Sequence, residues 1–210
     1  MIKTRKILDQ VTPYQLPTIP RGNKIRLDLN ENVKGCSPAV KKAINKAGSD
    51  DIAMYPEYQE LIEKLAHYLR LVLDNILLTN GADEAIRCIM DCYIEKGEKV
   101  IIPIPNYSMF GILAQLRGAE TKEVLYGNDF SFPLEDVFTT ISLRTRLVVI
   151  SNPNSLLGTS IKRSALIKIL RKTQALGSVV LLDETYHHFA QRTFVDLRIS
   201  WFATRICGIF

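Results

Sequence analysis

The chain of 210 residues lacks long hydrophobic runs, and none approaches the roughly 20 apolar residues that a membrane-spanning helix needs. The N-terminal stretch MIKTRKILDQ is basic but contains no apolar run of signal-peptide length. The sequence also has no internal repeat and no low-complexity segment. These absences predict a cytoplasmic protein with no membrane partner.

Cysteine is scarce, and the four thiols show neither a paired CxxC motif nor the spacing of a disulfide framework. Cys88 and Cys92 lie four residues apart on a predicted helix and therefore share a face, but no further ligand is nearby to complete a metal site. We expect Cys36, Cys88, Cys92 and Cys207 to be small buried thiols in a reducing compartment.

A dense basic patch is absent as well, although the formal net charge is +5. Lysines and arginines alternate with acids, as in EKGEK, which indicates solvated helix faces and no nucleic-acid partner. Of the three histidines, His67 falls on a helix surface. His187 and His188 are adjacent, so we expect their side chains to diverge toward the rim or the solvent and to hold no metal.

The N-terminal part carries few periodic apolar positions. Residues 1–25 contain three prolines and are predicted to form an extended arm. Ser37 followed by Pro38 is typical of a helix start, and this helix should end near Gly48. Leucines at four-residue spacing predict a second, amphipathic helix over 56–69.

From residue 75 onward, predicted strands and helices alternate. This order predicts an α/β fold, a largely parallel sheet with helices on both faces, and the continuous apolar runs fit strands that are buried on both sides. The predicted strands cover 75–79, 99–105, 119–126, 146–151 and 178–184, and the predicted helices cover 82–97, 107–118, 133–141 and 162–177.

Four polar clusters fall where these strands end, and ligands of parallel sheets bind outside the carboxyl ends of strands. The sequence contains no GxGxxG motif, so a dinucleotide fingerprint is not supported. The clusters are TNGADE (79–84), PIPNYSMF (103–110), SNPNSLLGT (151–159) and DETYHH (183–188).

The first two clusters each allow two interpretations. Gly81 permits close backbone approach, and the amides of Ala82 and Asp83 at a helix N-terminus favour an anion such as phosphate. Alternatively, Asn80 or Asp83 only caps the helix. Tyr107 either stacks on a flat ligand or packs in the core.

Asp183 ends the most apolar strand, where an unpaired carboxylate is costly. It would hold Mg²⁺ if a GxxxxGK[ST] loop were present, but the sequence has none. It would otherwise partner a protonated heterocyclic nitrogen, as pyridoxal chemistry requires, or form a structural ion pair. Tyr186, three residues on, would reach the same ligand.

Six segments in order resemble one family. They are LDLNEN (27–32), YPE (55–57), NILLTNGADEAI (75–86), VIIPIPNYSMF (100–110), NPNSLLGT (152–159) and VVLLDETYHHFA (179–190). Together they are similar to the histidinol-phosphate aminotransferases, within the fold-type-I pyridoxal-phosphate aminotransferases. The resemblance implies an incomplete PLP-binding large domain over 26–197, an atypical tail over 198–210, and no C-terminal small domain.

The resemblance implies roles for individual positions. Tyr55 matches a tyrosine that reaches the cofactor of the neighbouring subunit, which implies a homodimer. Asn30, Glu31 and Asn32 match the segment that borders the substrate. The cofactor residues implied are Gly81, Ala82 and Asp83 at the phosphate, Tyr107 on the ring, Asp183 at the ring nitrogen, Tyr186 near the ring oxygen, and Asn154 and Ser155 in the adjoining loop.

The chain departs from the family pattern in two places. Ser155 stands where the family has the asparagine that bonds the ring oxygen. The family's Schiff-base lysine follows the Asp-x-x-Tyr strand, whereas the last lysine here is Lys172, before Asp183, so no catalytic residue is assigned. We expect a truncated product whose reading frame shifts near residue 198.

These features give a functional expectation and two alternatives. The family passes an amino group between glutamate and imidazole-acetol phosphate in histidine biosynthesis, but this chain is expected to be inactive and to bind pyridoxal phosphate weakly and without a covalent bond. One alternative is a non-catalytic remnant or dimerising module. The other is a pyridoxal-phosphate decarboxylase that acts on a phosphorylated amino acid.

Overall fold

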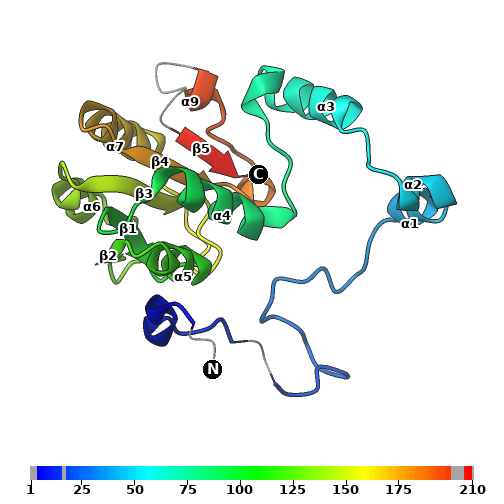
Figure 1. Cartoon of the computed structure of the whole chain (residues 1–210), viewed down its shortest axis with the longest axis horizontal. Coiled ribbons are helices and arrows are strands. Elements are labelled where there is room, and N and C mark those ends of the chain that lie inside the picture. The colour runs from blue at the N-terminus through cyan, green and yellow to red at the C-terminus, as the bar shows by residue number, and fades with distance from the viewer. Residues whose placement is uncertain (1–3, 16–17, 200–205, 210) are drawn as a thin grey trace.

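A five-stranded sheet forms the centre of the computed structural model, which describes residues 4–15, 18–199 and 206–209 (Figure 1). The strand order is β2-β1-β3-β4-β5, and every neighbouring pair is parallel, which confirms the predicted sheet. The strands are β1 (Lys99–Ile104), β2 (Glu120–Leu125), β3 (Thr145–Ser151), β4 (Val179–Asp183) and β5 (Ile206–Ile209).

Helices cover both faces of the sheet, as predicted, and the side chains of β3 show why. Leu147 and Val149 pack in one buried cluster, and Val148 and Ile150 pack in another, because alternate residues of a strand point to opposite faces. The first cluster lies beneath α4 (Gly81–Tyr93) and α5 (Met109–Leu116), and the second lies beneath α6 (Leu134–Thr140) and α7 (Arg163–Ala175).

The N-terminal part runs outside this body (Figure 1). The Ser37 hydroxyl accepts a hydrogen bond from the Val40 amide at 3.3 Å, so the predicted helix start is confirmed, but the helix ends at Ile44 rather than near Gly48. The division into arm, domain and tail stays a prediction. The elements here are η1 (Lys6–Gln10), α1 (Pro38–Ile44), α2 (Ser49–Ala53), α3 (Gln59–Leu69) and η2 (Leu73–Asn75).

Two expectations about strands are wrong. The strand predicted over 75–79 does not form, because Asn75 ends η2 and residues 76–79 pair with no strand in the described part of the chain. The Leu77 side chain is 75% exposed. Conversely, residues 206–209 of the tail, for which no element was predicted, form β5. They pair in parallel with the apolar strand β4, from Val180 opposite Ile206 to Asp183 opposite Ile209.

The expectation of buried thiols is also wrong. Cys36 and Cys92 are exposed, Cys88 and Cys207 are partly buried, and none of the four forms a disulfide bond within the described residues. In α4 the buried residues are Ile86 and Met90, and a residue two positions further along a helix lies on the opposite side. The shared face of Cys88 and Cys92 therefore points away from the sheet.

Two short helices, α8 (His187–Ala190) and α9 (Asp196–Ile199), follow β4. Across the described ranges, no helix is long and apolar enough to cross a membrane. Within the same ranges, no group of three or more His, Cys, Asp or Glu residues is arranged to hold a metal ion.

Candidate active site

The parallel pairing of β3 with β4 brings the ends of both strands to one edge of the sheet. Ser151 lies opposite Asp183 in the register, and the Asn152 amide donates to the Asp183 carbonyl at 2.7 Å. Each strand then turns into a polar loop. Residues 30 or more positions apart in the sequence therefore meet at this edge.

The Asp183 carboxylate is partly buried at the end of β4. Its Oδ1 atom accepts hydrogen bonds from the Thr185 amide at 3.0 Å and from the Thr185 hydroxyl at 2.7 Å. Burial raises the pKa of Asp183, and the two Thr185 hydrogen bonds oppose this rise. No Lys, Arg or His in the described residues forms an ion pair with it, so the structural ion pair considered from the sequence is not supported.

A chain of hydrogen bonds leads from β3 to α4 through the loop after β1. The Ser151 hydroxyl and the Tyr107 amide both donate to Oδ1 of Asn106, at 2.7 and 2.8 Å. The Tyr107 hydroxyl in turn donates to Oδ1 of Asp83 at 2.9 Å. Sequence reasoning missed Asn106 and Ser151, although both stand directly at strand ends within the polar clusters.

Tyr107 is partly buried among aromatic rings. Its ring meets Tyr14 edge-on at a centroid distance of 6.2 Å and Phe110 at 6.0 Å. Burial, followed by the hydrogen bond to Asp83, raises the pKa of the Tyr107 phenol well above its usual value. The phenol therefore remains a protonated donor at neutral pH.

Gly81 starts α4 in a left-handed conformation, with φ of +77°. A Cβ atom at Gly81 would meet nothing within 4 Å, so the backbone conformation and not space requires glycine here. The Asn80 side chain makes no capping hydrogen bond and instead donates to Glu84 at 2.9 Å, while Asp83 is bound to Tyr107. The interpretation of Asn80 or Asp83 as a mere cap is therefore not supported, and first-turn amides such as that of Ala82 have no intrahelical partner.

Five predicted site residues meet in an open cavity of about 370 Å³ beside these loops. Asn30 Nδ2 donates to the Tyr186 hydroxyl at 3.1 Å and so joins the N-terminal segment to the loop after β4. The cavity is lined by Asn30, Glu31, Asn154, Ser155 and Tyr186, together with Arg26, Leu27, Pro153, Gly158 and Phe189.

The Asn154 amide holds the loop that carries it. Its Nδ2 donates to the Pro105 carbonyl at 2.9 Å, and its Oδ1 accepts from the amides of Leu156 at 2.9 Å and Leu157 at 3.1 Å. The side chain is fully buried, whereas Ser155 next to it is only partly buried. Asn154 thus fixes the loop, and Ser155 is the more accessible of the two side chains.

Two predicted site residues, Asn32 and Tyr55, do not line the 370 Å³ cavity. The Asn32 side chain donates to the Gly35 carbonyl at 2.7 Å and closes an exposed turn. Tyr55 lies between α2 and α3 and is fully exposed, at 100%.

Glu184, which sequence reasoning did not single out, is completely buried and fully paired. Its Oε1 accepts from Asn152 Nδ2 at 3.0 Å and from the Phe194 amide at 3.0 Å, and its Oε2 accepts from the Thr193 hydroxyl. Burial raises the pKa of Glu184, while these bonds oppose the rise. The carboxylate therefore anchors the loop between α8 and α9.

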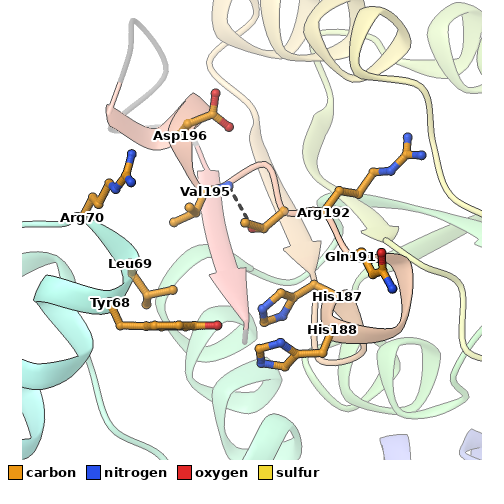
Figure 2. A pocket seen from close by; sticks show the side chains of 10 residues that line it. Tyr68, Leu69, Arg70, His187, His188, Gln191, Arg192, Val195 and Asp196 are labelled. Carbon is orange, nitrogen blue, oxygen red and sulfur yellow. Dashed lines mark hydrogen bonds between the residues drawn. The ribbon is translucent and has the colours of Figure 1, made fainter.

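A larger cavity, of about 650 Å³, lies elsewhere, between the end of α3 and the segment from α8 to α9 (Figure 2). The rings of His187 and His188 lie 3.9 Å apart by centroid at its wall, so the expected divergence is wrong. His187 Nδ1 lies 2.9 Å from the Glu184 carbonyl, which fixes this ring against its neighbour. Figure 2 shows Arg70 and Arg192 on opposite sides of the cavity, so they do not converge on one ligand.

Glu184 gives a prediction about pH. Its folded-state pKa lies above the unfolded value of about 4.3, so the stability that the protonated form contributes is present below that pH and is lost as pH rises through the folded pKa. Glu184→Gln removes this titration. Urea unfolding between pH 4 and 8 should show wild type losing stability relative to the variant as pH rises. A difference that stays constant or reverses would contradict this account.

Residues 22–206 match the sequence model of the family described as aminotransferase class I and II. The histidinol-phosphate aminotransferase of Thermoanaerobacter pseudethanolicus is 31% identical over 88% of this chain and 52% of its own length. The histidinol-phosphate aminotransferase of Methanosarcina mazei is 35% identical over 82% of this chain and 47% of its own length. The chain thus spans about half the length of these curated relatives.

Solved structures show the same fold. A structure from Erwinia carotovora atroseptica superposes with a TM-score of 0.81 at 25% identity and covers 89% of this chain and 55% of its own. The histidinol-phosphate aminotransferase from Clostridium acetobutylicum superposes with a TM-score of 0.68 at 23% identity and covers 80% of this chain and 48% of its own. With the family match over 22–206, the chain belongs to the class I and II aminotransferase family.

Proposed function

We propose that the strand-end site binds pyridoxal phosphate, the cofactor used by this family. The observation that carries the proposal is Asp183, a partly buried carboxylate at the end of β4 that has no cationic partner in the described residues. A cation beside it would offset the burial that raises its pKa. A protonated ring nitrogen supplies that cation, and Oδ2 is the carboxylate atom not used by Thr185.

The other groups at this edge suit the remaining parts of the cofactor. The left-handed Gly81 and the unpaired first-turn amides of α4 suit a phosphate, because the helix N-terminus carries positive partial charge. Tyr107 is held by Asp83 and offers an aromatic ring. Tyr186 and Ser155 offer hydroxyl groups in the adjoining cavity. When bound with its ring nitrogen protonated, the cofactor supplies an electron sink for bonds at an amino acid's α-carbon.

Transfer of an amino group also needs a lysine to bond the cofactor and carry a proton, and we find no lysine among the described residues that line the 370 Å³ cavity. The last lysine, Lys172, bonds the Phe138 carbonyl at the α6–α7 side of the sheet. We therefore propose that a polypeptide of residues 1–210 binds pyridoxal phosphate without a covalent bond and catalyses no transamination.

The substrate class follows from the relatives and belongs to this proposal. Two curated relatives that align with most of this chain are named histidinol-phosphate aminotransferases. The substrates that we propose for the intact family's site are therefore glutamate and imidazole-acetol phosphate. In this chain Asn30 and Glu31 would border the substrate, since they line the same cavity as Ser155 and Tyr186.

A spectral titration of residues 1–210 with pyridoxal phosphate tests the cofactor site. We expect saturable binding that dialysis reverses. Asp183→Ala should weaken it about ten- to hundredfold, because a hydrogen bond to a charged group contributes about 1.5–3 kcal/mol. Asp129→Ala, in an exposed turn, is the matched control.

Two further results would contradict this assignment. One is a one-to-one adduct of pyridoxal phosphate that borohydride reduction makes permanent, since it would show that a lysine forms an imine with the cofactor. The other is glutamate formation from histidinol phosphate and 2-oxoglutarate above the buffer rate. Equal affinities of wild type and Asp183→Ala for pyridoxal phosphate would contradict the role proposed for Asp183.

A homodimer completes the proposal and gives its own prediction. Exposed apolar side chains gather on α1, α2 and the residues after them, including Ile52, Met54 and the fully exposed Tyr55. Sedimentation velocity at micromolar concentration should show a dimer of residues 1–210. Ile52→Asp should shift it toward monomer, whereas Leu143→Asp, at an equally exposed site elsewhere, should not. A monomeric wild type would overturn the homodimer.

A further inference from the structure

Four charged side chains close the segment 21–31 on itself. Arg21 Nη2 donates to Asp28 Oδ1 at 2.8 Å and also bonds Glu31 Oε2. Arg26 Nη1 lies 3.5 Å from Glu31 Oε1, and Arg26 Nε donates to the Arg21 carbonyl at 3.4 Å. Residues 18–36 contain no helix or strand, so these side chains and not backbone pairing give the segment its shape.

The same segment forms one wall of the 370 Å³ cavity, through Arg26, Leu27, Asn30 and Glu31. Asn30 reaches across to the Tyr186 hydroxyl. It does so from a left-handed backbone conformation, with φ of +54°, which costs free energy for a residue other than glycine. Asp28 and Glu31 stand on either side of it, so the cation that binds both carboxylates also holds Asn30 in this conformation.

We propose that Arg21 is a positioning residue of the candidate active site: it binds Asp28 and Glu31 and thereby holds Asn30 against Tyr186. The identity of the ligand in the cavity rests on the proposed function, but the positioning itself does not.

The geometry also predicts which substitution keeps this role. One nitrogen of Arg21, Nη2, serves both carboxylates, whereas Nε is buried and has no hydrogen-bond partner in the described part of the chain. The planar fork of the guanidinium group is therefore not used. A lysine, which is a single-nitrogen cation, would keep both ion pairs and leave no buried donor unpaired, whereas a glutamine would lose the charge.

Backbone ¹⁵N relaxation of the ligand-free chain tests the inference. In wild type the amides of residues 26–31 should have order parameters near 0.8, and in Arg21→Gln they should fall below about 0.6. Arg21→Lys should retain the wild-type values. Arg144→Gln, which removes a comparable ion pair to Glu120 at the far end of the sheet, should also retain them. Surface ion pairs contribute little to global stability, so the melting temperature should be similar in all four proteins.

The cofactor titration provides the second readout. Pyridoxal phosphate should bind about three- to tenfold more weakly to Arg21→Gln, because the competent conformation is less populated, and with wild-type affinity to Arg21→Lys. Unchanged order parameters in Arg21→Gln, or a loss in Arg21→Lys equal to that in Arg21→Gln, would overturn the inference. A wild type that fails to bind pyridoxal phosphate would overturn the proposed function, and the relaxation data would still decide the role of Arg21.

Discussion

The parallel register between β3 and β4 places Ser151 beside Asp183, and the rest of the candidate site depends on this pairing. It aligns two strand ends so that the loops after β3 and β4 share one edge of the sheet. Ser151 then reaches Asn106, which fixes Tyr107 and, through it, Asp83 at the start of α4. A shift by one residue would turn Asp183 toward the opposite face of the sheet and separate these groups.

The two adjacent carboxylates at the end of β4, Asp183 and Glu184, differ in burial and in hydrogen bonding. Glu184 is completely buried, and its two oxygens are satisfied by Asn152, Thr193 and the Phe194 amide, so it organises the chain. Asp183 points to the other side of the backbone and is bonded through one oxygen only. An incompletely paired carboxylate that is partly withdrawn from water is costly, and the proposed cationic ligand would offset that cost.

The sequence predicts the sheet well because β1, β3 and β4 are apolar runs bounded by turn residues, and such runs have few other stable arrangements. It fails where the outcome depends on a distant partner. Residues 76–79 have the composition of a strand but meet no strand to pair with, whereas residues 206–209 have no clear periodicity but meet the open edge of β4. The role of Asn106 was missed for the same reason, since its importance comes from Ser151, 45 positions away.

The central claim is that Asp183 holds a protonated ring nitrogen in a chain that has no lysine after Lys172. The most direct measurement is the ¹⁵N chemical shift of pyridoxal phosphate labelled at its ring nitrogen and bound to residues 1–210 at pH 8. The account predicts the shift of a protonated pyridinium nitrogen in wild type and that of an unprotonated pyridine in Asp183→Asn. An unprotonated nitrogen in wild type, or the same shift in both proteins, would contradict it.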